Sequence, residues 1–244
     1  MPGAWIEDLS WPEVAERITG GWPVLIPVGA AAKEHGPHLP MNTDWLIARA
    51  LAGRVAAALP VLVAPVVSHG HYPAFVRYPG SQSLQAATMI ALMVDLLDRF
   101  IEQGATRLAI LNTGVSTEAP IALAVREVWD AHGVKVGTAH LRELGLAAGA
   151  LLKNPGGGHG DERETSLMLA IAPERVRLDR LAATSPARAP ATIFRVPIDL
   201  APTTDPEGYL GDPRHASAAT GVALLNAITD ELIEGLRTLF PDAF

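Results

Sequence analysis

Short apolar runs that alternate with helical patterns constrain the fold of this chain more than any other feature. The runs are nearly continuous in aliphatic residues, as is typical of parallel strands that are covered on both faces. Helical segments separate them, and such alternation favours right-handed βαβ units. We therefore predict an α/β fold with three layers, α/β/α, around a mainly parallel central sheet. The runs span residues 24–29, 61–67, 107–114 and 134–141, and the helical segments span 44–59, 84–104 and 119–133.

Length and composition narrow the class of protein. The 244 residues suit a single domain, 1–244, and a hydrophobic fraction of 49% allows a sizeable core. A net charge of −7 without any basic run argues against nucleic acid as the main partner. The chain has no cysteine, so a metal site must use His, Asp and Glu, which suit zinc, manganese or iron.

The remaining segments add two expected helices and no linker. Helical patterns cover about 161–171 and 216–240, whereas 176–215 reads as irregular, with one short strand expected at ATIFRVPI (191–198). The N-terminus has acids where a secretory signal needs a basic start and an apolar middle. The apolar stretches are broken well before the ~18 residues that a membrane span needs. We expect a cytoplasmic protein with no membrane partner.

Three polar loops follow predicted strands. In parallel sheets of this kind, ligands bind beyond the carboxyl ends of the strands. We therefore expect all three loops to meet at one edge of the sheet. The loops are KEHGPHLPMNTD (33–44), SHGHYPAFVRYPGS (68–81) and NTGVSTE (112–118).

The first of these loops gathers ionisable side chains in a chain that has few charges. Each has an ordinary explanation: Asp44 can cap the next helix, His35 and His38 can be polar loop residues, and Glu34 can be a solvated charge. The conjunction is harder to dismiss. Two prolines stiffen the loop and one glycine permits a tight bend. Such a rigid loop lowers the entropy cost of assembling a metal site from His35, Asp44 and Glu34.

The stretch GGGHGDERETS (156–166) opens a later helix. Its acids suit the positive end of a helix dipole, which explains them adequately. That explanation does not cover His159, which stands among glycines. Glu164 directly precedes the apolar run SLMLAI, so its side chain can point inward.

Together these motifs resemble the creatininase (creatinine amidohydrolase) family. The resemblance covers nearly the whole chain in the same order, and HGPHLP…D and HGDERETS are its specific elements; YPGSQSL, the Asn–Gly loop and GYLGDPRHAS are weak alone. It implies a creatininase-like three-layer fold and a homo-oligomer, hexameric in creatininase itself. It also implies divalent zinc or manganese, as one or two ions, and a water that cleaves a C–N bond.

The resemblance also assigns roles to residues. His35 matches the family's loop histidine ligand, and Asp44 matches the aspartate that bridges two metals. Glu164 matches a further ligand in the E-T-S element. His159 matches the histidine beside the substrate and the attacking water. Glu34 is a candidate fourth ligand and a second catalytic candidate.

Two departures from the family pattern stand out. The family places a glutamate two residues before the loop histidine, where this chain has Lys33. Either Glu34 reaches the metal after a small backbone shift, or Lys33 replaces the charge of a cation there. The family also reads N-G-H-G-G-N after the third strand, where this chain has NTGVSTE. Its histidine ligand aligns with Gly114 or Val115, and Glu118 could replace it only along a different loop path.

Two further histidines follow the second predicted strand. His69 and His71 could supply the missing ligand, because their loop reaches the same sheet edge; a place in the wall of a pocket is the plainer interpretation. A nucleotide-binding loop is disfavoured, because NTGVSTE lacks both the G-x-G-x-x-G and the G-K-[ST] patterns. A Ser-His-Asp triad is disfavoured for want of a G-x-S-x-G elbow.

The leading interpretation is a metal-dependent amidohydrolase that acts on an amide or cyclic amide of a small molecule. Because the loop after the third strand and Gly158, the residue before His159, depart from creatininase, a deformylase or a ring-opening enzyme on a sugar-like compound fits at least as well as creatinine hydrolysis. One alternative is a non-catalytic or regulatory small-molecule-binding paralogue with a degraded metal site. Another is a metal-free enzyme that uses Lys33 as base or nucleophile.

Overall fold

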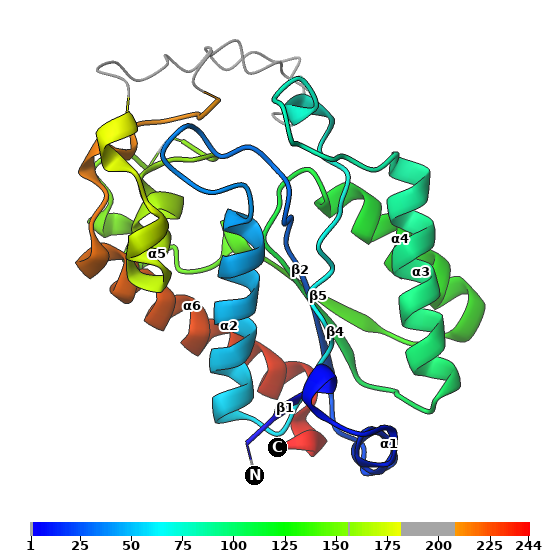
Figure 1. The fold of residues 1–244 in the computed structure, drawn as a ribbon. Helices are drawn as coiled ribbons and strands as arrows, with labels where there is room; N and C mark the ends of the chain where they lie inside the picture. The colour runs from blue at the N-terminus through cyan, green and yellow to red at the C-terminus, as the bar shows by residue number, and fades with distance from the viewer. Residues whose placement is uncertain (1, 156, 182–207) are drawn as a thin grey trace, which may run out of the picture.

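A parallel sheet forms the centre of the molecule. The structure, a computed structural model, describes residues 2–155, 157–181 and 208–244. Within these ranges five parallel strands lie in the order β1-β3-β2-β4-β5, with helices on both faces (Figure 1). This confirms the predicted three-layer fold. The strands are β1 (Ala4–Trp5), β2 (Val24–Val28), β3 (Leu62–Val63), β4 (Leu108–Asn112) and β5 (Val136–His140).

The helices match the predicted segments to within a few residues. The N-terminal strand β1 and helix α1 were not expected from the sequence pattern, and the strand expected at 191–198 lies outside the described residues. The helices are α1 (Trp11–Thr19), α2 (Thr43–Ala58), α3 (Ala86–Glu102), α4 (Glu118–His132), α5 (Glu162–Ile171) and α6 (Ala218–Leu239).

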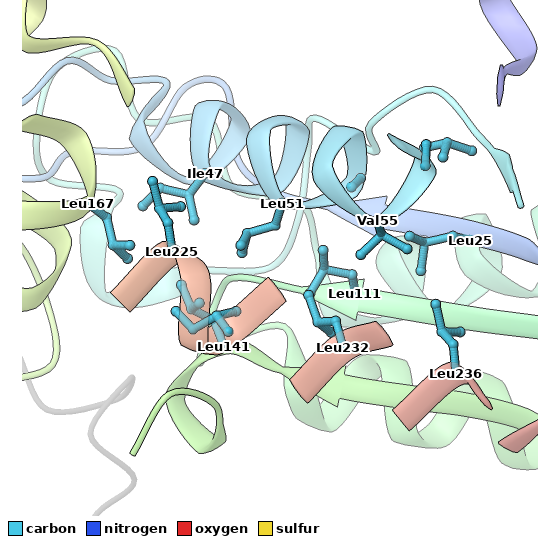
Figure 2. Packing of buried hydrophobic residues seen from close by; sticks show 14 of the residues in the cluster. Leu25, Ile47, Leu51, Val55, Leu111, Leu141, Leu167, Leu225, Leu232 and Leu236 are labelled. Atoms are coloured by element: carbon cyan, nitrogen blue, oxygen red, sulfur yellow. The ribbon is translucent and has the colours of Figure 1, made fainter. Parts of the chain in front are cut away.

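The two faces of the sheet build two separate hydrophobic clusters. Because side chains alternate along a strand, Leu25 faces the cluster formed with α2, α5 and α6, while its neighbour Ile26 faces the cluster formed with α1, α3 and α4. Figure 2 shows the first cluster, in which Leu51 of α2 and Leu232 of α6 approach Leu111 of β4. The sheet is therefore covered on both faces, as its continuous apolar strands predicted.

The chain changes direction across the middle of this sheet. The loop after β2 leads into α2 on one face, and the loop after the neighbouring strand β4 leads into α4 on the other face. Val28 and Asn112 are paired at the carboxyl ends of these two strands. Loops that diverge in this way open a crevice, which is the usual ligand site of such sheets.

None of the helices in the described ranges combines the length and the apolar character that a membrane crossing requires.

Candidate metal centre

His35 directs the lone pair of a ring nitrogen at a carboxylate. Its Nδ1 lies 2.9 Å from the backbone oxygen of Lys33, and a carbonyl oxygen can only accept, so Nδ1 carries the proton. In a neutral ring Nε2 then holds a lone pair, yet it lies 3.0 Å from Oδ1 of Asp44. Two electron-rich atoms at this distance repel each other in a fully buried place. Either a second ring proton or a cation must lie between them.

The geometry at His35 suits a divalent ion. Two ligand atoms at right angles around an ion, each at about 2.1 Å from it, are about 3 Å apart. That is the separation of His35 Nε2 and Asp44 Oδ1. Histidines that bind metals usually donate their other ring N–H to a carbonyl or carboxylate, and the Lys33 carbonyl fills that role. The donor set of one nitrogen and carboxylate oxygens fits zinc or manganese.

Residues 159–164 bring two more ligand atoms to His35. The ligand atoms of His35, His159 and Glu164 all lie within 4.8 Å of one another. Glu164 is held in place because its Oε2 accepts the Gly160 N–H at 2.6 Å. Asp161 caps α5 by accepting the N–H of Glu164 at 3.0 Å. The sequence expectation of a helix start therefore holds for Asp161, while Glu164 turns inward.

Burial and nearby charges shift the pKa values of Glu164 and Asp44 in opposite directions. Burial raises the pKa of Glu164 to about 7, and the neighbouring Asp44 and Asp161 add to the shift against the opposing effect of His35. Burial also opposes ionisation of Asp44, but Lys33 and His35 outweigh it and hold the pKa of Asp44 well below its usual range. Glu164 is therefore the acid of the centre that lacks a compensating cation.

His159 is neutral and has one nitrogen free. Burial lowers the pKa of His159 to about 4, although the hydrogen bond to Glu34 acts in the opposite direction. Its Nε2 lies 3.2 Å from Oε2 of Glu34, so in the neutral ring Nε2 donates to that carboxylate. The lone pair of Nδ1 is then available to bind an ion or accept a proton. The ring also packs against Phe75, with centroids 4.3 Å apart.

Glu34 lies behind His159 and outside the group of three ligand atoms. Its carboxylate accepts the Gly36 N–H, and its backbone N–H donates to Ser81 Oγ at 3.0 Å. Gly208, at φ +81°, lies against this carboxylate with no room for a side chain. The late stretch that begins at Gly208 is fixed to the centre because the Leu210 N–H donates to the His159 carbonyl at 2.8 Å. Glu34 is thus buried, contrary to the expectation of a solvated charge.

Lys33 occupies the second oxygen of Asp44. Its Nζ lies 2.6 Å from Asp44 Oδ2, and both side chains are almost fully buried. The ammonium also lies 5.2 Å from the centre of the Phe75 ring. Asp44 stands in the first turn of α2, and its carboxylate is engaged by Lys33 and His35. The expectation that Asp44 simply caps this helix is therefore wrong.

His38, the other histidine of the loop, has a structural place. It is buried, and its Nε2 lies 2.8 Å from Thr165 Oγ1 on α5. Burial lowers the pKa of His38 to about 4. The ring meets Tyr209 edge-on, with centroids 5.7 Å apart. His38 therefore joins the loop after β2 to α5 and to the late stretch of the chain, which brings Glu164 and His35 together.

The loop after β4 contributes no ligand to the group of three. Thr117 Oγ1 donates to Asn112 Oδ1 at 2.6 Å, and Asn112 Nδ2 donates to the Gly114 carbonyl at 2.6 Å. Glu118 forms an ion pair with Arg142 at 2.6 Å. The polar groups of this loop thus largely satisfy one another, and Glu118 is engaged away from the centre.

The two histidines of the loop after β3 are also held elsewhere. His71 Nδ1 lies 3.0 Å from the Leu84 carbonyl, and His69 is exposed beside Ser68. His69 lines a small pocket, in keeping with its expected place in a wall. The pocket opens between the ends of β2 and β4, and its lining includes Lys33, Asp44, His69, Asn112, Ser116 and Thr117.

Phe75 and Tyr209 take part in the centre although sequence reasoning did not single them out. Phe75 contacts both Lys33 and His159, and Tyr209 contacts His38. Phe75 lies in the loop SHGHYPAFVRYPGS, which was expected at the same sheet edge, and Tyr209 lies in the stretch GYLGDPRHAS; neither pattern assigned these side chains a role in a metal site.

Curated relatives share this chain's full length. A creatinine amidohydrolase from Pseudomonas putida is 31% identical over 261 residues, covering 97% of each chain. A mycofactocin precursor peptide peptidase from Mycobacterium ulcerans is 28% identical, covering 93% of this chain and 90% of the relative.

Solved structures agree with the fold. A structure named "Creatininase Mn" is 28% identical, covers 98% of this chain and 99% of its own, and superposes with a TM-score of 0.85. A creatininase variant described as "Zn-Zn type" is 29% identical, covers 99% of this chain and 100% of its own, and gives a TM-score of 0.84. The family model of creatinine amidohydrolase matches residues 7–236. The chain therefore belongs to the creatininase family.

Proposed function

We propose that this chain is a metal-dependent hydrolase that cleaves a C–N bond, in an amide or cyclic amide of a small molecule. The observation that carries the proposal is the 3.0 Å contact between His35 Nε2 and Asp44 Oδ1, where a divalent ion would remove the repulsion between the lone pair and the carboxylate. The relatives support the reaction class, because an amidohydrolase and a peptidase both hydrolyse C–N bonds. The structures named for manganese and zinc support those metals.

Three side chains would hold the ion: His35 through Nε2, Asp44 through Oδ1, and Glu164. A ring nitrogen of His159 also lies within 4.8 Å of the ligand atoms of His35 and Glu164. A divalent ion at this place supplies a water whose pKa is lowered toward ~7, which makes a nucleophile at neutral pH. Glu164 gains the positive charge that its buried carboxylate otherwise lacks.

His159 and Glu34 would move the protons. His159 accepts a proton from the attacking water at Nδ1, while its Nε2–H stays with Glu34. As the water oxygen bonds to the carbonyl carbon and the C–N bond breaks, His159 returns that proton to the departing nitrogen. Glu34 holds the ring tautomer and stabilises the positive charge that His159 bears in between. The Phe75 ring excludes water from one side of this pair.

Metal loading and substrate screening test the proposal together. Chelator-treated protein is loaded with manganese or zinc, and metal content is measured by mass spectrometry. Loaded protein is then assayed against cyclic amides, N-formyl compounds and short peptide amides. We expect micromolar binding and hydrolysis of at least one class, with His35→Ala as the inactive control. If no divalent metal binds with micromolar affinity, the hydrolase proposal is wrong.

A non-catalytic paralogue is the second candidate, because Lys33 occupies an oxygen of Asp44 in the centre. It predicts that metal or small molecules bind without turnover in the same screen. The metal-free alternative predicts that Lys33→Ala abolishes activity while a chelator has no effect. The proposed hydrolase predicts loss of activity with the chelator and recovery when metal is restored.

Assembly into a homo-oligomer, a hexamer by resemblance, stays a prediction. Light scattering of purified protein across a concentration series measures the mass directly, and a particle of 25.7 kDa at all concentrations would contradict it.

A further inference from the structure

Lys33 is an unusual residue for the place that it occupies. Lysine is rarely buried unless it is paired, and here only 7% of its side chain is exposed, next to an Asp44 side chain that is 2% exposed. Burying both partners costs roughly several kcal/mol of solvation free energy for each ion, so such a pair is poor evidence for added stability. The position calls for a reason connected with the centre itself.

Asp44 divides its two oxygens between two positive neighbours. Oδ2 contacts Lys33 Nζ at 2.6 Å, and Oδ1 faces the proposed ion site at His35. If this carboxylate bridged two metal ions, Oδ1 would bind one ion and Oδ2 would bind the other. The ammonium already stands there, at hydrogen-bond distance. Among the described residues, Asp44 is the carboxylate with which Lys33 Nζ forms an ion pair.

The charge balance of the buried centre points the same way. Glu34, Asp44 and Glu164 supply three negative charges when ionised, and Lys33 supplies one positive charge. Asp161, next to Glu164, adds one further negative charge, which the nearby Arg163 offsets. One divalent ion makes the sum zero. A second divalent ion would leave a net charge of two in a place with little water, where uncompensated charge is costly.

The loop after β4 offers nothing to hold a second ion. Asn112 and Thr117 bond to each other, and Glu118 is paired with Arg142. This loop and Lys33 line the same pocket. A second ion next to Asp44 Oδ2 would therefore find no histidine and no unpaired carboxylate in the loop after β4.

We propose that the Lys33 ammonium is a built-in cation that takes the place of a second metal ion, so that the centre binds one divalent ion per chain. The inference rests on the proposed function, because it assumes that an ion binds at His35. The pocket between β2 and β4 is then lined by the Lys33 ammonium and by Asp44, which would hold the single ion. The ammonium cannot be removed by chelators, so one of the two cations at Asp44 stays in place when the metal is stripped.

Counting metal ions in three proteins tests the inference. Wild-type chain, Lys33→Glu and Lys33→Arg are stripped with chelator, saturated with manganese and freed of excess. Ions per chain are counted by mass spectrometry and located by anomalous scattering from crystals. We expect one ion in the wild type, in contact with His35 and Asp44, and one ion in Lys33→Arg, which keeps the charge. We expect two ions in Lys33→Glu, the second between Asp44 Oδ2 and the introduced carboxylate.

The outcomes separate the inference from the function on which it rests. Two ions in the wild type would overturn the inference and leave the hydrolase intact, whereas no ion would overturn both. A folded Lys33→Glu protein with one ion would show that Lys33 does not exclude the second ion, which also overturns the inference. If Lys33→Glu fails to fold, Lys33→Gln replaces it: a count above one at millimolar manganese supports the inference, and a count of one overturns it.

Discussion

The loops after β2 and after β4 leave neighbouring strands at the same edge of the sheet, yet they are built in opposite ways. The loop after β2 is rich in ionisable groups, and His35 and Glu164 beside it are left in need of a cation. The loop after β4 closes on itself, because Asn112, Gly114 and Thr117 bond to one another. Position at a strand end is therefore not enough to make a site. What matters is whether the polar groups already form hydrogen bonds within their own loop.

The largest effect should come from the first loop. His35→Ala removes the ligand nitrogen around which the centre is arranged, and loss of a supporting group alone costs about 10–100-fold in metal affinity. We expect a loss of at least ~100-fold for the ligand itself, measured by calorimetric titration with manganese, together with hydrolysis at background. Asn112→Ala, its counterpart on β4, should bind manganese as the wild type does. Equal losses in both variants would remove the distinction between the loops.

His159, which precedes α5 and lies against the first loop, should affect kcat far more than metal affinity. His159→Gln should keep most of the metal affinity, because His35, Asp44 and Glu164 remain. We expect kcat to fall by about 10²–10⁴, the usual contribution of a positioned acid or base, with KM little changed. Steady-state kinetics and metal content on the same samples check this. If the metal is lost together with kcat, His159 is a ligand and not the proton carrier.

In the second loop, the expected effect is on folding and not on metal. Thr117→Val removes the hydroxyl that donates to Asn112 Oδ1 and leaves that buried oxygen with the longer bond from the Gly114 N–H at 3.3 Å. The loss of one such hydrogen bond costs about 0.5–1.5 kcal/mol in the free energy of unfolding. Urea denaturation measures the change, and manganese titration provides the control. Unaltered stability with weakened metal binding would place this loop in the centre after all.

The smallest effect is expected at the outer end of the second loop. Burial raises the pKa of Glu118, and Arg142 opposes that shift, but the arginine is 55% exposed and solvent screens the pair. We therefore expect Glu118→Gln to change the free energy of unfolding by no more than ~1 kcal/mol and to leave the metal content unaltered. A drop in bound metal would revive Glu118 as a substitute ligand.

The fold followed from local patterns, because continuous apolar strands and amphipathic helices report burial directly. The strands at 24–28 and 108–112 and the helix at 43–58 were visible for that reason. Helix α1 was not expected, although it begins with a capping box at Ser10 and Glu13. Only Ile18 of this helix is buried, and the segment as a whole is not apolar, so it does not stand out in the sequence.

The site was harder to predict than the fold, because its geometry depends on contacts between distant segments. His35, Asp44, His159 and Glu164 could be named as candidates, and their assigned roles stay predictions. The sequence left open whether Lys33 or Glu34 would approach the centre. The structure places Lys33 on Asp44 and Glu34 on His159. A side-chain direction of this kind is decided by where Gly208 and Phe75 leave room, and spacing along the chain does not encode it.

Lys33 serves the centre through two separable parts. Its carbonyl fixes the proton of His35, and its ammonium holds Asp44. Every amino acid has the first part, and only the second depends on the side chain. A mutation at this codon can therefore change the charge of the centre while the orientation of the histidine is inherited unchanged. Under the proposed one-ion centre, a single substitution at position 33 is expected to change the number of bound ions.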